Sequence, residues 1–367
     1  MAILRNLCRL CFHKYKVRSL FFAPVRYFAR TPCVSVKSTV SAANPSIKLR
    51  YVYVQTCVNT WEDIPNGVLF DVCYADSHPD DDLKTTASLP TIVALHNTPG
   101  SHDDLIQVLE SFVLMGCRVI APNFPGFGHT EGLSSEHDEI FMHTNDEKSQ
   151  FVCDFLENIG IKRVDMIIGI GSGCFPLLRL CTSVVTKDIF KSAVFISPWP
   201  VTEDFRLIQP ISIHRAVVWL WEHPVYRPLV FLIVHMRKML FSGFSEFIVK
   251  DFVCTSYTIC GIDFAEVAGL AVGLSHMEIP KLVLFGENDE FIPSPLVEDL
   301  VKMLGIPRNK MIECDEKGNL NNSYNEREEC PNSVVFLHGS KDLFHDYETL
   351  TITLLWKFLK NIRPDIK

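Results

Sequence analysis

Short apolar runs alternate with amphipathic stretches over most of the chain. Two β-rich runs near the start, joined by a polar stretch with Pro-Asn-Gly, predict an antiparallel pair. The strands that we expect cover residues 49–58, 68–74, 91–96, 118–121, 164–168, 192–196, 281–285 and 333–337. Since the later strands are apolar throughout and alternate with helices, the pattern predicts an α/β fold with a mostly parallel sheet covered on both faces.

Helical periodicity and end signals place the helices between these strands. Ser101 can cap a helix whose first turn holds Asp103 and Asp104. Residues 145–159 form an amphipathic helix that Gly160 closes, and a further helix covers residues 296–304.

The alternation stops between residues 199 and 278. Aromatic, aliphatic and proline-broken helical segments fill this stretch, which predicts a helical cap over the end of the sheet where ligands bind. The core is then divided into residues 49–198 and 279–367, and the acidic, Asn-rich segment 313–332 is predicted to be a loop. Trp219, Leu229 and Phe231 in the cap favour an apolar ligand, although they also suit a cap core.

The segment Gly169-Ile170-Gly171-Ser172-Gly173 follows an apolar strand and opens a helix. This is the context of a nucleophile elbow, in which two outer glycines allow close packing and the central residue carries the nucleophile. In that register the central residue is Gly171, which has no side chain. Shifting the register by one makes Ser172 the nucleophile, but places Ile170 and Cys174 at the outer positions, where a branched residue crowds the turn.

Two further turns follow strands, His96-Asn97-Thr98-Pro99-Gly100 and Pro122-Asn123-Phe124-Pro125-Gly126-Phe127-Gly128. Together with the elbow, and in this order, they resemble the α/β-hydrolase family over residues 50–367. Within it, the chain is similar to a poorly characterised group known mainly from nematodes.

The resemblance implies an eight-stranded, mostly parallel sheet, a triad in the order nucleophile, acid, histidine, and no cofactor. It implies an oxyanion hole built from the N–H groups of Ser172 and of a residue near Thr98, with His96 and Asn97 beside it. Asn97 stands where the family usually has glycine.

The acid of the triad corresponds to Asp289, which follows the strand at 281–285, with Glu287 as the weaker candidate. The histidine corresponds to His338 at the end of the last strand, or to His345. Counting back from the last helix places the family's usual Gly-His pair nearer Ser340-Lys341.

The first fifty residues contain ten basic and no acidic side chains. An amphipathic, acid-free start resembles a mitochondrial transit peptide, so we expect residues 1–28 to be removed after Phe28, residues 29–48 to form a linker, and the protein to be mitochondrial. A disordered basic tail is the alternative.

The remaining chain holds 25 basic against 43 acidic side chains, which argues against nucleic-acid binding. Thirteen cysteines without a regular framework favour free thiols. No stretch predicts a membrane span, because Glu222, His223 and Pro224 interrupt the most apolar one, but the cap suits peripheral membrane contact.

These features favour a hydrolase-fold protein that is catalytically degenerate at Gly171 and binds a small apolar or acyl-type ligand or a partner. The alternative is an active serine hydrolase of ester, thioester or lipid acyl groups, with Ser172 as nucleophile, His338 as base and Asp289 as its orienter. A metal or water-based mechanism on His96, His129 and Asp289 has no recognised ligand spacing, so no metal site is predicted.

Overall fold

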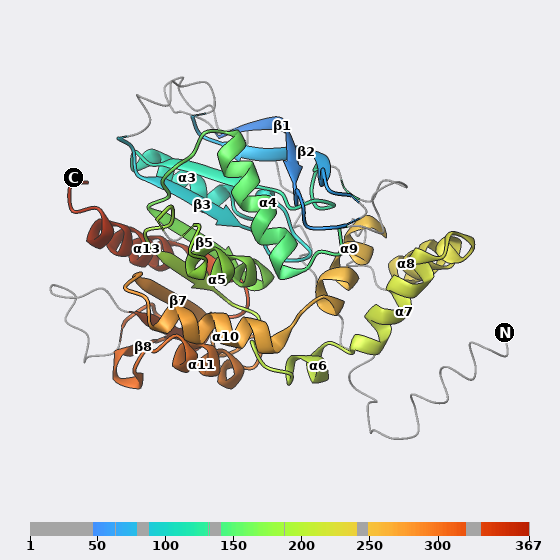
Figure 1. Ribbon diagram of the computed structural model, residues 1–367. Coiled ribbons are helices and arrows are strands. Elements are labelled where there is room, and N and C mark those ends of the chain that lie inside the picture. The colour runs from blue at the N-terminus through green and yellow to red at the C-terminus, as the bar shows by residue number, and fades with distance from the viewer. Residues whose placement is uncertain are drawn as a thin grey trace, which may run out of the picture.

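A nine-stranded sheet runs through the part of the chain that the computed structural model describes (Figure 1). That part is residues 47–366 without 63, 79–87, 131, 133–140, 187, 241–248 and 321–331. The strand order is β1-β2-β4-β3-β5-β6-β7-β9-β8, and all neighbours are parallel except β1 with β2 and β2 with β4. The strands are β1 Lys48–Thr56, β2 Val68–Asp76, β3 Thr91–Leu95, β4 Arg118–Pro122, β5 Met166–Ile170, β6 Ala193–Ile196, β7 Lys281–Gly286, β8 Met311–Cys314 and β9 Ser333–Phe336.

The expected number of eight strands is corrected to nine by β8 at the sheet edge. It pairs in parallel with β9 and contains Glu313 and Cys314, where the sequence predicts the start of the acidic loop. Ile312 and Cys314 face inward and Glu313 outward, an alternation too short to stand out in the sequence. Residues 321–331 of the predicted loop lie outside the described residues.

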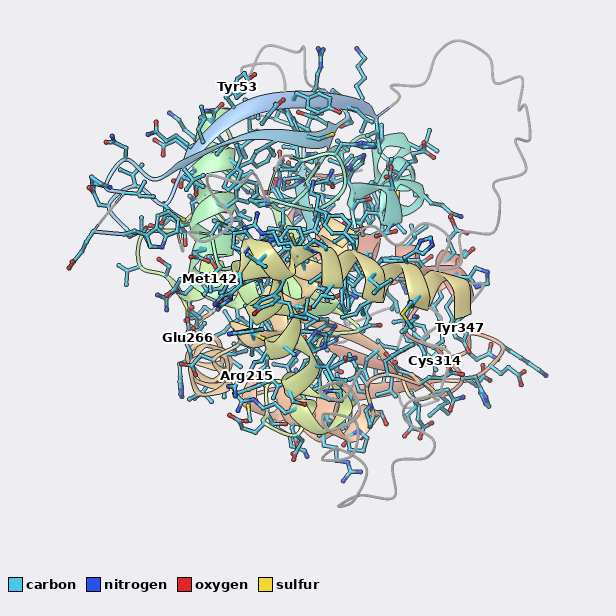
Figure 2. The ribbon with its side chains drawn as sticks, turned by 90° about the vertical axis from the view of Figure 1, so that its right-hand side faces the viewer. Tyr53, Met142, Arg215, Glu266, Cys314 and Tyr347 are labelled. Atoms are coloured by element: carbon cyan, nitrogen blue, oxygen red, sulfur yellow. The ribbon has the colours of Figure 1, made fainter. Side chains whose placement is uncertain are left out.

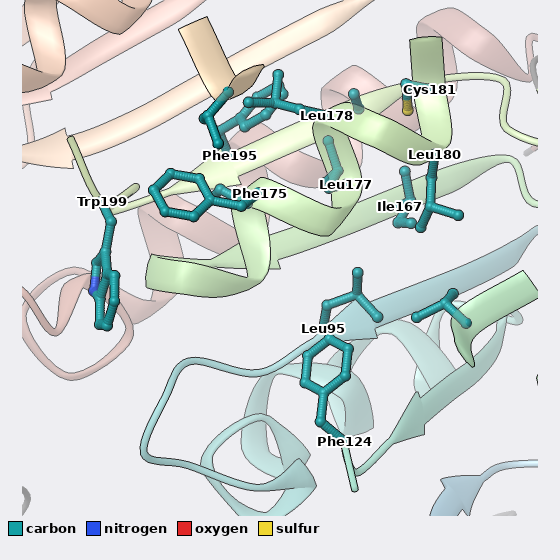
Figure 3. Packing of buried hydrophobic residues seen from close by; sticks show 14 of the residues in the cluster. Leu95, Phe124, Ile167, Phe175, Leu177, Leu178, Leu180, Cys181, Phe195 and Trp199 are labelled. Carbon is teal, nitrogen blue, oxygen red and sulfur yellow. The ribbon is translucent and has the colours of Figure 1, made fainter. Parts of the chain in front are cut away.

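Helices cover both faces of the sheet, as predicted. On one face α3 and α13 pack on side chains such as Ile92 and Ile168, and on the other α4, α5, α10 and α11 pack on side chains such as Val93 and Ile167. Figure 3 shows part of the second cluster, with Leu177 of α5 close to β5. The helices of these layers are α3 Ile106–Leu114, α4 Asn145–Asn158, α5 Cys174–Thr182, α10 Phe264–Ser275, α11 Ser294–Met303 and α13 Glu348–Ile362.

The segment predicted as a cap contains five α-helices in its described part, and they belong to two different cores. Side chains of α7, α8 and α9, among them Val217, Val230 and Val253, form a separate small cluster. By contrast, α10 packs against α5 and α11 and contributes Val267 to the main core. The other helices of this segment are α6 Phe205–Ile208, α7 Ile211–Glu222, α8 Arg227–Leu240 and α9 Val249–Cys260.

In the described residues, no single helix has the length and hydropathy needed to cross a membrane. Two bent helix pairs meet those criteria together, one joining α7 to residues 224–236 and the other joining α9 to α10.

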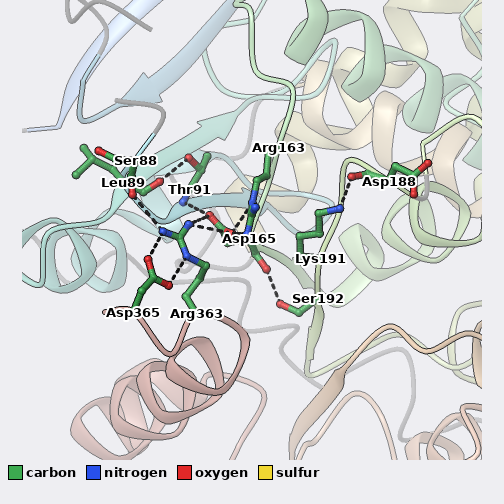
Figure 4. A network of polar contacts seen from close by, with 10 residues as sticks. All are labelled: Ser88, Leu89, Thr91, Arg163, Asp165, Asp188, Lys191, Ser192, Arg363 and Asp365. Carbon is green, nitrogen blue, oxygen red and sulfur yellow. Dashed lines mark hydrogen bonds and ion pairs between the residues drawn. The ribbon is translucent and has the colours of Figure 1, made fainter. Parts of the chain in front are cut away.

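A buried carboxylate fixes the amino-terminal ends of the central strands, opposite the candidate site (Figure 4). Asp165 accepts hydrogen bonds from the backbone N–H of Thr91 at 3.0 Å and from the guanidinium of Arg363 at 3.2 Å, while its own carbonyl accepts one from Ser192. These bonds tie β3, β5 and the end of α13 together and leave the carboxyl-terminal ends of the strands to form the site.

Candidate active site

A cavity of about 390 Å³ lies at the carboxyl-terminal ends of the parallel strands. The loops after β3, β5, β6, β7 and β9 form its walls, together with side chains of α6 and α9 from the cap. Open α/β sheets bind ligands at this end. Of the candidate site residues that the sequence singles out, Gly171, Asn97, Thr98, His96, Asp289 and His345 line the cavity.

The elbow has the backbone geometry that its glycines predict. Gly171 adopts a φ of +54°, in the left-handed region that a nucleophile elbow requires at its apex. A Cβ on Gly169 would lie 2.8 Å from the carbonyl oxygen of Gly173, and one on Gly173 would lie 2.6 Å from that of Leu95. The turn between β5 and α5 is therefore close-packed on both sides, with Gly171 facing the cavity.

Asn97 fills the space in front of Gly171. A Cβ built on Gly171 would collide with the side-chain amide of Asn97. The Oδ1 atom of Asn97 also accepts a hydrogen bond of 2.9 Å from the backbone N–H of Ser172. That N–H is the one that the family resemblance assigns to the oxyanion hole, so the Asn97 amide occupies both the nucleophile's volume and one oxyanion donor.

Ser172 lies beside this contact without facing the cavity. It is buried and is absent from the cavity walls, whereas its neighbour Gly171 is part of them. Within the described residues its side chain has no hydrogen bond to an imidazole.

His96 is a buried clamp between two loops. Its Nδ1 donates to the carbonyl oxygen of Asn97 at 2.6 Å, and its Nε2 accepts from the N–H of Phe124 at 3.0 Å. The Phe124 amide can only donate, which makes the Nδ1–H tautomer the consistent one. Burial lowers the pKa of His96 to about 3, so the ring is neutral. Both of its nitrogens are occupied by these hydrogen bonds.

Thr98 adds a hydroxyl to the cavity wall. Its side chain is buried, and its Oγ1 has no hydrogen-bond partner among the described residues. Thr255 of α9 also lines the cavity with a buried hydroxyl that lacks a partner there. Thr255 could not be identified from the sequence, because nothing in the neighbouring residues indicates which face of α9 covers the cavity.

Asp289 occupies the loop after β7. Its Oδ1 accepts hydrogen bonds from the backbone N–H groups of Phe291 at 2.8 Å and Ile292 at 3.0 Å. Burial raises the pKa of the Asp289 carboxyl, although these bonds and the charge of Lys341 act in the opposite direction. Glu287 is exposed and does not line the cavity.

The loop after β9 brings other residues than His338 to the cavity. His338 is exposed and absent from its walls, which at this point consist of Lys341, Asp342 and the residues up to His345. The Nζ of Lys341 lies 4.1 Å from the ring centroid of Phe291, which follows the acid Asp289 by two positions. His345 reaches the cavity rim with an exposed side chain, its Nδ1 3.4 Å from Oδ1 of Asp346.

Charged side chains around the cavity are mostly acidic. Asp104, Asp289, Asp342 and Glu348 line it against a single lysine, Lys341. No group of three potential metal ligands occurs among the described residues. His129 is exposed and lies away from the cavity walls, so His96, His129 and Asp289 are not brought together.

Comparisons with known proteins agree with this architecture. A family described as "alpha/beta hydrolase of unknown function (DUF1057)" matches residues 66–346. No curated protein matches the chain.

Solved structures with the same fold share little sequence with the chain. A putative lipase from Acinetobacter baumannii has a TM-score of 0.57 at 15% identity, with 88% of this chain and 93% of that chain covered. A thermophilic esterase from Thermogutta terrifontis has a TM-score of 0.55 at 13% identity, with 85% and 99% covered. For a haloalkane dehalogenase from Bradyrhizobium elkani the values are 0.54 and 12%, with 87% and 100% covered.

Proposed function

The chain belongs to this family of α/β hydrolases of unknown function, and we propose that it has lost covalent hydrolysis and uses its cavity to bind a small apolar or acyl-type ligand. The observation that carries the proposal is the contact between Asn97 and the elbow. An acyl-enzyme route needs a nucleophile at the apex and a free oxyanion donor beside it. Gly171 supplies no nucleophile, and the Ser172 N–H already donates to Asn97.

The position of the general base supports the same proposal. A base must lie within hydrogen-bond reach of both the nucleophile and its orienting acid. The cationic neighbour of Asp289 is Lys341, and His338 is exposed outside the cavity. His345 lies at the cavity rim, exposed, with its Nδ1 beside the carboxylate of Asp346. The apex, the oxyanion donor and the base therefore all depart from what a serine hydrolase requires.

The cavity walls favour an uncharged ligand. Apolar side chains such as Ile170, Trp199 and Phe291 line it, and the buried hydroxyls of Thr98 and Thr255 offer hydrogen bonds to a polar group. The excess of carboxylates over the one lysine opposes a carboxylate ligand by like-charge repulsion. An alcohol, ether or ester on an apolar chain fits these groups better than a free fatty acid.

Decanol and decanoate test the ligand class, because they share a chain length and differ in charge. We expect decanol to raise the thermal midpoint at concentrations where decanoate does not. Ile170→Trp, which places a larger side chain in the cavity wall, should remove the decanol effect while a matched change at the exposed Val184→Trp should not. Equal stabilisation by both compounds, or an unchanged effect in Ile170→Trp, contradicts the proposal.

Hydrolysis is tested by rebuilding the site. We expect no activity on p-nitrophenyl esters from the parent or from Gly171→Ser, because Asn97 blocks the new side chain. Asn97→Gly with Gly171→Ser clears the volume, and Lys341→His offers a base near Asp289. Activity in the parent protein overturns the non-catalytic proposal.

The second candidate function is a serine hydrolase of ester, thioester or lipid acyl groups that uses Ser172. What favours it is the presence of Ser172 next to the apex and of Asp289 in the cavity wall. A fluorophosphonate probe should then label the folded protein at Ser172, and Ser172→Ala should abolish the labelling while Ser197→Ala, in the cavity wall, should not.

We also propose that residues 1–28 direct the protein to mitochondria. The acid-free, basic start of the chain supports this, and these residues lie outside the described part. Sequencing the amino terminus of the protein isolated from cells should give Ala29, whereas an intact Met1 contradicts the proposal.

A further inference from the structure

Helix α8 carries two apolar stripes, of which the fold buries only one. Val230 and Val234 are 0% and 4% exposed and belong to the small core of the cap. A second set, spaced i, i+3, i+4 and i+7, stays in solvent with exposures of 42–53%: Leu229, Leu232, Ile233 and Met236. This spacing is that of an apolar helix face that packs against something.

The neighbours of α8 along the chain also expose apolar side chains. Ile213 and Trp219 of α7 and Val225 and Tyr226 of the intervening turn are exposed as well. The rings of Trp219 and Tyr226 stack with their centroids 5.3 Å apart. Figures 1 and 2 show α7 and α8 on one side of the molecule, with α8 lying across its surface. Exposed apolar side chains concentrated on one pair of helices are typical of an interaction site.

The charge of this segment identifies the kind of partner. Residues 211–240 contain Arg215, Arg227, Arg237 and Lys238 against the single acid Glu222, in a chain with a formal charge of −8. The sequence of α8 contains no acid. The positive charge of this sequence segment complements anionic lipid head groups. A second copy would instead place two positive segments against each other.

The dimensions of α8 fit a position in the membrane interface. Its 14 residues give a length of about 21 Å, short of the ~30 Å hydrocarbon core. It also meets α7 at a bend of 110°. We propose that the outer face of α7 and α8 docks on membranes that contain anionic phospholipids, with α8 in the plane of the interface. This inference does not depend on what the cavity binds.

Fluorescence quenching by brominated phosphatidylcholine tests the docking at the face itself. Vesicles of this lipid with phosphatidylserine are added to the full chain, and we expect quenching that Trp219→Phe largely removes. A local readout is needed because the basic first fifty residues can attract anionic vesicles on their own. Quenching that persists in Trp219→Phe, or its absence in the parent protein, overturns the proposal.

Vesicle sedimentation measures how much the stripe contributes. Leu232→Ser, Ile233→Ser and Met236→Ser combined should lower the partition coefficient about tenfold or more, because three apolar side chains no longer enter the lipid. The control, Val184→Ser with Val185→Ser, changes two exposed apolar residues after α5 and should have no effect. The replaced side chains are exposed, so the thermal midpoint of both variants should match the parent.

Two results would count against the membrane. Unchanged sedimentation of the triple variant removes the stripe from binding. A concentration-dependent dimer that the triple variant abolishes, without vesicle binding by the parent, assigns the face to a second copy of the chain.

Discussion

The elbow after β5 and the loop after β9 contribute to the same cavity but differ in how far they match a hydrolase. The elbow has the left-handed φ at Gly171 and the close contacts at Gly169 and Gly173. The loop after β9 presents Lys341 to the cavity and leaves His338 in solvent. The backbone of the elbow therefore matches that of a hydrolase, whereas the side chains that hydrolysis would need do not match.

This difference has a physical reason. The elbow glycines take part in packing, because strand, turn and helix touch there, so the folded state depends on them. A catalytic histidine in a loop has few packing contacts, and its loss costs little stability. Substitutions in the two regions should therefore change stability and chemistry separately.

The largest effect should come from Gly173→Ala. The added Cβ would lie 2.6 Å and 2.8 Å from the carbonyl oxygens of Leu95 and His96, which are backbone atoms of β3 and its loop. Relieving such an overlap requires strand and helix to separate, so we expect a loss of about 3 kcal/mol in unfolding free energy. The midpoint of urea unfolding at neutral pH measures it.

Gly269→Ala is the matched control for that substitution. Gly269 lies in α10, and a Cβ there would meet no atom within 4 Å. Replacing an exposed helical glycine by alanine should stabilise the protein by roughly 0.5–1 kcal/mol. Equal urea midpoints for the two variants would show that close packing at the elbow does not limit the stability of the fold.

The next effect concerns His96, a histidine of the motif that serves the fold. Burial lowers its pKa to about 3, so below pH 6.5 the unfolded chain binds a proton that the folded ring does not. The contribution of neutral His96 to the free energy of unfolding is therefore complete above pH 6.5 and is lost as the pH falls toward 3. Between pH 6.5 and 5 we expect a loss of about 2 kcal/mol from this group.

Urea unfolding of the parent and of His96→Gln at both pH values isolates this contribution. Burial also lowers the pKa of His143, so the parent's total slope is larger than that of His96 alone. We expect His96→Gln to be less stable than the parent at neutral pH. Its unfolding free energy should, however, change less between pH 6.5 and 5. Identical slopes would mean that His96 is accessible to protons in the folded state.

The sequence was sufficient for the parts of the fold that repeat or obey local rules. Ser101 caps the 3-10 turn His102–Asp104, which holds the two predicted acids and precedes α3, through its bond from the Asp103 N–H. The apolar strands and the glycine spacing of the elbow could likewise be predicted from neighbouring residues in the sequence. The four-residue strand β8 was missed because its alternation is too short, and the placement of α10 in the main core required knowledge of its neighbours.

The candidate site was less predictable because its contacts join distant segments. Asn97 and Ser172 are 75 positions apart, and nothing in either motif says that the Asn97 amide faces the apex. His338 was chosen because it ends a strand, with His345 as the alternative, but the chain turns after β9 and brings Lys341, Asp342 and His345 to the cavity while His338 stays outside. Side-chain direction in loops depends on tertiary packing, which a single sequence does not specify.

We expect a smaller effect, an energetic coupling between substitutions at Gly171 and Asn97. Gly171→Ser adds a side chain in a left-handed conformation and against the Asn97 amide, and Asn97→Gly removes the hydrogen bond to the Ser172 N–H. Combined, the second substitution clears the space that the first needs. A double-mutant cycle in urea should give a coupling of about 1–2 kcal/mol that favours the pair. A coupling near zero would mean that the two groups do not compete for this space.

The smallest effect should come from Asp289→Asn, which tests whether the carboxylate at the position that the resemblance assigns to the triad acid contributes to folding. Burial raises the pKa of this carboxyl, so the folded state holds the proton more tightly than the unfolded chain. The unfolding free energy therefore falls as the pH rises from the ordinary pKa of an aspartate through the raised pKa of Asp289. This loss remains at neutral pH. Asparagine keeps an Oδ1 for the N–H groups of Phe291 and Ile292 and carries no charge.

The expected result is a gain of about 0.5 kcal/mol at neutral pH that shrinks toward pH 4, measured by urea unfolding of both proteins. Glu287→Gln is the control, since that side chain is exposed and its removal should change nothing. A loss of stability in Asp289→Asn would show that the carboxylate is needed by Lys341 for folding. Asp289 would then be needed for stability, as the elbow glycines are. Stability and chemistry would in that case not be separate in the loop after β7.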